Sequence, residues 1–159
     1  MRETYQPIRE ILNYLRGVHG EAAACCAGAK DAFAEPNGAS AERLQMLTDF
    51  FREGEVQVAT HLNSGAEAAP AEVLDTWVQF VPTGDVDQAL DDLHAATEEG
   101  PAPTFAACLA LHKQMVKALR HLVEIVPAEE ARDMLQHLAD MEEQAMRELS
   151  MADTMGQDG

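Results

Sequence analysis

The chain has 159 residues, and 28 acidic against 11 basic side chains give it a formal net charge of −17. This length suits one domain with a single hydrophobic core. Such an acidic surface would repel a nucleic-acid backbone or an anionic membrane, so we expect neither as a partner. The sequence is rich in residues that lose little side-chain freedom in a helix, Ala above all, and its composition favours an all-α fold.

The residues Met1–Tyr5 are polar and charged and lack the apolar core of a signal peptide. No stretch of the chain approaches the apolar length needed to span a bilayer. The cysteines Cys25, Cys26 and Cys108 are odd in number and two are adjacent, which is a poor disulfide framework. We therefore expect a cytoplasmic protein with reduced thiols. No glycine-rich nucleotide loop or nucleophile elbow identifies a small-molecule substrate, a cofactor-binding residue or a catalytic residue.

In the N-terminal half, apolar residues recur every three to four positions over two long segments. This periodicity predicts helices from about Gln6 to Phe33 and from about Ala41 to Leu62. The inward stripe of the first helix reads Ile8, Ile11, Leu12, Leu15, His19, Ala22, Cys26, Ala29 and Phe33. The stripe of the second reads Leu44, Leu47, Phe51, Glu55, Val58 and Leu62.

A long connection follows, from Ser64 to Ala102. Pro70 opens a short helix that we expect Pro82 to close. Its stripe consists of Val73, Leu74, Trp77 and Phe80. Because a Trp buries a large apolar area, we expect Trp77 to lie buried under this crossover. A second short helix is predicted from about Asp85 to Thr97.

The same periodicity predicts two further long helices, one from about Pro103 to Val126 and one beginning at Pro127. The third stripe reads Phe105, Cys108, Leu109, His112, Met115, Val116, Leu119, Leu122, Val123 and Val126. The fourth reads Ala131, Met134, Leu135, Leu138, Met141, Glu142, Ala145 and Leu149. Residues 152–159 lack apolar anchors, so we expect one domain over residues 1–151 and a mobile C-terminal tail.

Two antiparallel helix pairs joined by one long crossover form the ferritin-like arrangement of a four-helix bundle. Three stretches carry a closer resemblance: Ile11–Ala22, Val73–Pro82 and Leu135–Leu149. On these stretches the chain resembles the ferritin-like, rubrerythrin-like superfamily, and within it a poorly characterised bacterial group. The resemblance implies a ferritin-like four-helix bundle. A redox or metal-storage role is implied by the same resemblance alone.

Each predicted long helix carries a His or Glu on its inward face near its midpoint: His19, Glu55, His112 and Glu142. In an antiparallel bundle the midpoints lie at one level, so we expect these four side chains to converge. Two carboxylates and two imidazoles are a suitable shell for iron, manganese or zinc. The four residues are therefore the candidate ligands of one divalent metal ion.

Ferritin-like di-iron sites use a Glu from each of two helices and a Glu-x-x-His pair from each of the other two. No Glu-x-x-His occurs in this chain, since Val58 follows Glu55 at that spacing and Ala145 follows Glu142. The alternative is a bundle without metal in which these groups hydrogen-bond to one another, because an unpaired buried charge is costly. Of the two, the sequence favours the metal-free bundle.

Other residues near this level leave further alternatives open. Gly17, Gly20 and Gly54 flank the polar residues and indicate close backbone approach or a local bend, for a ligand or for packing alone. Cys26, Cys108 and His112 could form a zinc or copper site, although buried cysteine is more often a small apolar residue. Cys25 lies off the stripe, and no neighbouring base is evident. His61, His121 and His137 are expected on the surface.

The sequence therefore favours a structural or association module with a degenerate or absent di-iron site and no cofactor. The alternative is a metal-binding bundle with a redox or metal-handling role. Whether the protein is an enzyme stays undecided. We also expect a homodimer, because Tyr14, Val18 and Phe50 widen the apolar stripes beyond what one core needs.

Overall fold

The structure is a computed structural model that describes residues 5–33, 38–62, 70–79 and 84–158, with backbone alone at residues 39 and 152–158. Within these residues the chain is mostly helical, with six helices and one two-stranded sheet. The long helices are α1 (Ile8–Ala32), α2 (Ala39–Leu62), α5 (Pro101–Ile125) and α6 (Glu129–Asp158). The connection between α2 and α5 holds α3 (Ala71–Leu74), β2 (Trp77–Gln79) and α4 (Gly84–Ala96), and β1 is Tyr5–Pro7.

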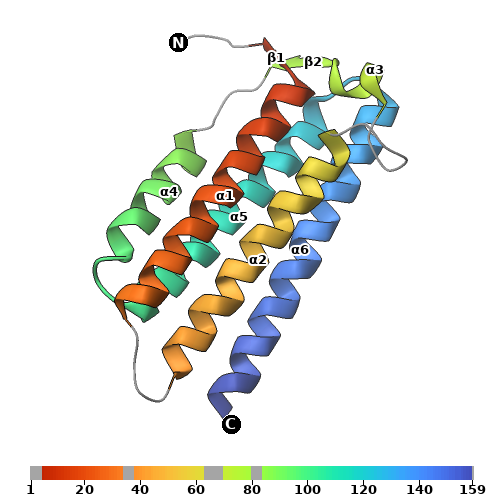
Figure 1. The fold of residues 1–159 in the computed structure, drawn as a ribbon. Coiled ribbons are helices and arrows are strands. Elements are labelled where there is room, and N and C mark those ends of the chain that lie inside the picture. Colours follow the sequence, from red (N-terminus) through yellow and green to blue (C-terminus); the bar gives the residue numbers. More distant parts are fainter. Residues whose placement is uncertain (1–4, 34–37, 63–69, 80–83, 159) are drawn as a thin grey trace.

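The four long helices lie side by side in one bundle (Figure 1). The helices α1 and α2 are antiparallel neighbours, as are α5 and α6, because short connections return the chain beside itself. The helices α2 and α5 run in the same direction, since the long connection between them crosses the bundle. The predicted all-α class and the four long helices are confirmed, with boundaries shifted by a few residues.

The core lies where the apolar stripes of the four long helices meet. Its largest side chains are almost fully buried, and they come from all four helices: Ile11, Leu15, Leu44, Leu47, Phe51, Leu111, Met115, Leu122 and Leu135. Spacings of three and four residues keep these side chains on one face of each helix. The periodicity read from the sequence places most of this core, but on α5 it missed the buried Leu111 and included Leu109 and Val123, which are only partly buried.

The first short element of the crossover differs from its prediction. Helix α3 ends at Leu74, and Trp77 begins strand β2, which pairs with β1 in antiparallel register, Pro7 opposite Trp77. Side chains alternate along a strand, so Val78 turns inward with 3 % exposure while Trp77 is 62 % exposed. The expectation of a buried Trp77 is wrong, because the chain changes from helical to extended geometry before reaching it. Phe80 and Pro82 lie outside the described residues.

Helix α4 packs outside the bundle against α1 and α5 (Figure 1). The Tyr14 hydroxyl on α1 donates a hydrogen bond to the Asp87 carboxylate on α4, and Val18 is buried. Burial, followed by the contact with Asp87, raises the pKa of Tyr14. Two of the three residues on which the homodimer was predicted, Tyr14 and Val18, are thus covered by the chain itself. Phe50 is half-buried.

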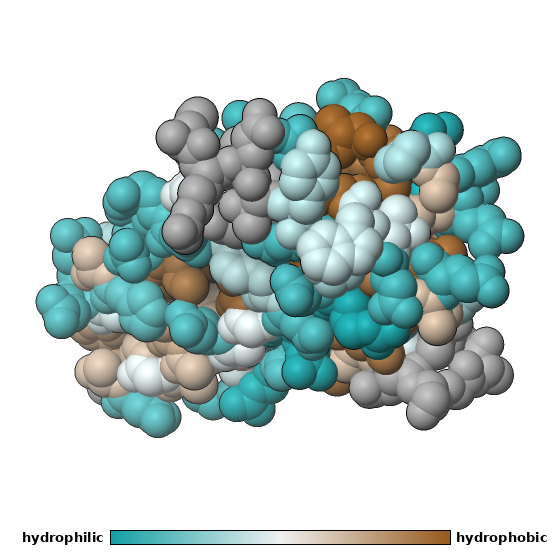
Figure 2. Space-filling view, turned by 90° about the horizontal axis from the view of Figure 1, so that it is seen from above, coloured by the Kyte–Doolittle hydropathy of each residue, from teal (hydrophilic) through white to brown (hydrophobic). Residues whose placement is uncertain are grey.

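At the end of the bundle that carries β1 and β2, hydrophilic residues dominate and apolar residues form small separate groups (Figure 2). Among the described residues, no helix combines the length and the hydropathy of a membrane-spanning segment. Helix α6 continues to Asp158, beyond the end that the sequence predicted. The mobile tail at residues 152–159 stays a prediction.

Candidate functional site

Three of the four predicted polar residues meet in the middle of the bundle. They are His19 from α1, His112 from α5 and Glu142 from α6, and each is at most 3 % exposed. The His112 Nε2 atom lies 2.5 Å from Glu142 Oε2, and His19 Nε2 lies 3.1 Å from Glu142 Oε1. We call these three residues the polar centre. One carboxylate thus bridges two imidazoles from different helices.

The backbone of α1 orients the first imidazole. His19 Nδ1 donates its proton to the carbonyl oxygen of Leu15, 2.8 Å away. In the neutral ring Nε2 then carries a lone pair, and it faces the carboxylate oxygen Glu142 Oε1. His19 Nε2 and Glu142 Oε1 have no aligned hydrogen-bond partner. The same is true of His112 Nδ1. A cation between His19 and Glu142, either a proton on Nε2 or a metal ion, would relieve the repulsion between their lone pairs.

The bridging carboxylate is ionised at neutral pH. Burial by itself would raise the pKa of Glu142, but the pairing with His112, then the pairing with His19, and the attraction of both imidazoles outweigh it and lower the pKa to about 2. A buried carboxylate is tolerated when it is paired and hydrogen-bonded. The two imidazoles meet this requirement for Glu142.

A glycine on α2 makes room for the polar centre. A Cβ atom on Gly54 would lie 2.4 Å from His19 Cδ2 and 2.7 Å from His19 Nε2. The rings of Phe50 and Phe51 on the same helix meet His112 edge to face, with centroids 4.8 Å and 6.5 Å away. Helix α2 therefore contributes its bare backbone and two aromatic edges, and no charged group, to the polar centre.

Glu55 does not join the polar centre, contrary to the convergence predicted for all four residues. Its carboxylate lies beside Gly20 on α1, with Oε2 3.3 Å from the position of a Cβ there, and its side chain is half-buried. Gly54 faces the imidazoles, and the next residue is turned by about 100° around the helix axis. The predicted close backbone approach is confirmed at Gly54, whereas a Cβ on Gly17 would meet nothing within 4 Å.

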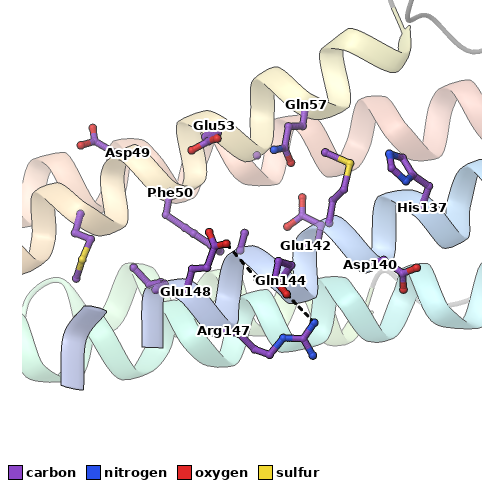
Figure 3. Close-up of a pocket in the computed structure, with 15 residues that line it drawn as sticks. Asp49, Phe50, Glu53, Gln57, His137, Asp140, Glu142, Gln144, Arg147 and Glu148 are labelled. Carbon is purple, nitrogen blue, oxygen red and sulfur yellow. Dashed lines mark hydrogen bonds between the residues drawn. The ribbon is translucent and has the colours of Figure 1, made fainter. Parts of the chain in front are cut away.

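A groove of about 720 Å³ runs between α2 and α6 and reaches the polar centre (Figure 3). Both Gly54 and Glu142 line it. Its apolar lining residues are Met46, Phe50, Met141, Ala145 and Leu149. Its charged lining residues, Glu142 apart, are Asp49, Glu53, Asp140, Arg147 and Glu148. Perturbed acidic groups that border a cleft are common at functional sites, which makes the groove and the polar centre one candidate site.

The donor set does not fit a di-iron centre, because the polar centre supplies one carboxylate. Among the described residues, no group of three or more His, Cys, Asp or Glu side chains is placed so that it could hold a metal ion. The 2.5 Å separation of His112 and Glu142 is also short for two ligands of one ion, which lie about 3 Å apart when each bond is about 2 Å long. As they stand, the three side chains pair with one another.

The cysteines occupy two separate places. Cys26 and Cys108 are buried, and their Sγ atoms lie 3.2 Å apart, between α1 and α5. Cys25 is half-buried, and its Sγ lies 3.4 Å from His94 Nδ1 on α4, so a neighbouring base is present that sequence reasoning missed. Burial, then the charges of Cys26 and Glu21, raise the pKa of Cys25 to about 11. The Cys25 thiol therefore stays protonated at neutral pH.

The three histidines predicted to lie on the surface are not part of the polar centre. His121 and His137 are exposed as predicted, and His61 is half-buried with its ring centroid 6.4 Å from that of His137. Asp140 beside the groove is paired with Arg120 at 2.8 Å.

No protein-family model matches this chain, and no curated protein and no solved structure matches it either. The function is therefore argued from the polar centre and from the groove.

Proposed function

We propose that this protein is an association module of the ferritin-like type, which binds a partner helix in the groove between α2 and α6. Two antiparallel helix pairs with a long crossover support the ferritin-like assignment. The observation that carries the association function is the groove itself, which is lined by apolar side chains and by acidic groups (Figure 3). Grooves of this kind accept the apolar face of an amphipathic helix.

The groove has the dimensions of a short helix. It spans residues 46–57 of α2 and 137–149 of α6, which corresponds to about 17 Å of helix, or about three turns, at 1.5 Å per residue. A partner helix of about 11 residues would present apolar side chains on one face over that length.

The charge of the groove selects a basic partner. Asp49, Glu53 and Glu148 outnumber Arg147, and Asp140 is already paired with Arg120. The whole chain has a net charge of −17, so a second copy would meet electrostatic repulsion. We therefore assign the groove to an amphipathic helix with Lys or Arg beside its apolar face. The homodimer predicted from the sequence becomes a competing outcome of the test.

The polar centre keeps the groove in shape. Glu142 on α6 contacts His19 on α1 and His112 on α5. Gly54 packs the backbone of α2 directly against the ring of His19. These contacts fix both walls of the groove before a partner arrives. A groove that is already formed in the free protein binds with a smaller ordering cost.

The proposal is tested with a fluorescent amphipathic peptide of Leu and Lys and with a scrambled peptide of identical composition. At moderate salt the amphipathic peptide should bind and the scrambled one should not. Ala145→Arg places a large cation in the groove and should weaken binding at least tenfold, whereas Ala110→Arg, on the exposed face of α5, should leave it unchanged. Equal binding of the scrambled peptide, or no effect of Ala145→Arg, would refute the groove as the site. Light scattering that shows a dimer dispersed by Ala145→Arg would assign the groove to a second copy.

A second candidate function is the binding of one divalent metal ion by His19, His112 and Glu142. The observation in its favour is that His19 Nε2 and Glu142 Oε1 face each other at 3.1 Å without an aligned hydrogen bond. Imidazole nitrogen and carboxylate oxygen suit iron, manganese or zinc, which would supply Lewis-acid or redox chemistry when bound. His112 would have to withdraw from its 2.5 Å contact with Glu142 to admit the ion. Elemental analysis of the protein after incubation with each metal decides between a loaded centre and a proton-bridged one.

A further inference from the structure

Two thiols from different long helices meet in the core between α1 and α5, whereas the groove lies between α2 and α6. Cys26 of α1 and Cys108 of α5 are 0 % and 1 % exposed, and both are free cysteines. Their Sγ atoms are 3.2 Å apart although the residues are separated by 82 positions in the sequence. Neither the polar centre nor the groove includes either residue.

Small residues surround Cys26 on the buried face of α1. Along α1, Ala22, Ala23, Cys26 and Ala29 form the buried face, so the side chains between the helix axes are short. On α5 the residue that meets this face is Cys108, through the contact between the two Sγ atoms. Close backbone approach is what a disulfide requires, since its two Cα atoms lie about 4.4–6.8 Å apart.

We propose that Cys26 and Cys108 form an intramolecular disulfide when the protein meets a peroxide, and that this bond locks α1 to α5. One Cys sulfur attacks the peroxide, the O–O bond breaks, and water leaves with the thiol proton, which gives a sulfenic acid. The second sulfur attacks that sulfenic sulfur, the S–O bond breaks, the S–S bond forms, and a second water leaves. Two thiols are oxidised by two electrons, and one hydrogen peroxide is reduced to two waters.

The surroundings of the pair make this reaction slow and the product durable. The hydrogen bond with Cys26, together with burial, raises the pKa of Cys108, so no thiolate forms in the closed core. Oxidation must therefore pass through a transiently opened conformation. Once formed, the disulfide is sealed from small reductants by the same packing. The Cys25 Sγ atom contacts His94 on α4 instead of joining this pair.

The experiment uses the full chain with Cys25→Ala, which leaves Cys26 and Cys108 as the two thiols. After incubation with hydrogen peroxide, the intact mass should fall by two hydrogens and both thiols should become unreactive in denaturant. A disulfide peptide joining residues 26 and 108 should appear after digestion. Closure of so long a loop should raise the Tm by about 10 °C, and reduction under denaturing conditions followed by refolding should reverse the shift.

The matched control carries Cys108→Ala as well as Cys25→Ala. It should take up oxygen on Cys26 or form intermolecular dimers, with no intramolecular bond and no rise in Tm. The proposal is overturned when Cys26 and Cys108 stay free even after prolonged incubation with peroxide under mildly destabilising conditions that open the core. Independent oxygen addition to each thiol, without a cross-linked peptide, overturns it equally. Peptide binding in the groove is a separate readout, so failure here leaves the association function to its own test.

Discussion

Gly54 of α2 lies directly against the imidazole ring of His19 on α1, with so little space that a Cβ atom on the glycine would fall 2.4 Å from Cδ2 of the ring. Real Cβ atoms essentially never approach another atom so closely. Both partners are buried, and the ring is held on its other side by the Leu15 carbonyl and by Glu142. The backbone of α2 and the orientation of His19 therefore depend on each other.

Gly54→Ala should destabilise the protein, although Ala is the better helix former by about 1 kcal/mol. The added methyl group must push α2 away or displace His19 from Glu142, and overpacking of this kind costs about 1–3 kcal/mol. Urea unfolding measures the change. Gly17→Ala is the matched control, because a Cβ there meets nothing within 4 Å and the substitution should stabilise the helix. If both substitutions stabilised the protein equally, the backbone of α2 would not be packed tightly against His19.

Glu142→Gln should lower stability at neutral pH by about 3 kcal/mol, since the pKa of Glu142 is lowered from 4.5 to about 2 in the folded state. A carboxyl group with a depressed folded pKa stabilises the fold above its unfolded pKa. This contribution is lost as the pH falls from 4.5 towards 2. The stability difference between the parent protein and Glu142→Gln should therefore shrink over this range. A difference independent of pH between 7 and 2 would contradict the bridging role of the carboxylate.

The fluorescence of Trp77 should resemble that of an indole in water, because this residue is 62 % exposed and is the one Trp of the chain. Acrylamide should quench it readily. Removing the ring by Trp77→Ala should change the free energy of unfolding by less than about 1 kcal/mol, as expected for surface positions. Val78→Ala, on the buried side of the same strand, is the control and should cost more. A blue-shifted, poorly quenched emission would indicate that a partner or a second copy covers this end.

Metal content should separate the two candidate functions. A loaded centre would hold at most one ion per chain, because three ligand residues meet there. Binding would require neutral imidazoles, so affinity would fall as the pH drops through the histidine range. His112→Ala should then abolish binding and His137→Ala should leave it intact. Two irons per chain would refute both the single-ion site and the metal-free centre.

Local patterns along the chain were enough to predict the four long helices and most of the polar centre. The apolar spacing within each long segment fixes which face is buried, and this local property placed His19, His112 and Glu142 inside the bundle. Their common level followed from their positions near the helix midpoints. The missing Glu-x-x-His pairs could likewise be read without coordinates, because they concern residue identity and spacing alone. These conclusions needed no knowledge of which helix packs against which.

Tertiary structure decided what depends on lateral contacts between distant segments. Periodicity marks a face to within about one residue, or about 100° of rotation, so it could not choose between Gly54 and Glu55 as the residue that meets His19. Trp77 entered a strand because Tyr5–Pro7, far away in the sequence, supplies its hydrogen-bonding partner. The contact between Cys26 and Cys108 likewise joins two helices that are far apart in the sequence. Each outcome is set by the direction in which one helix or strand faces another, which a pattern along a single segment does not encode.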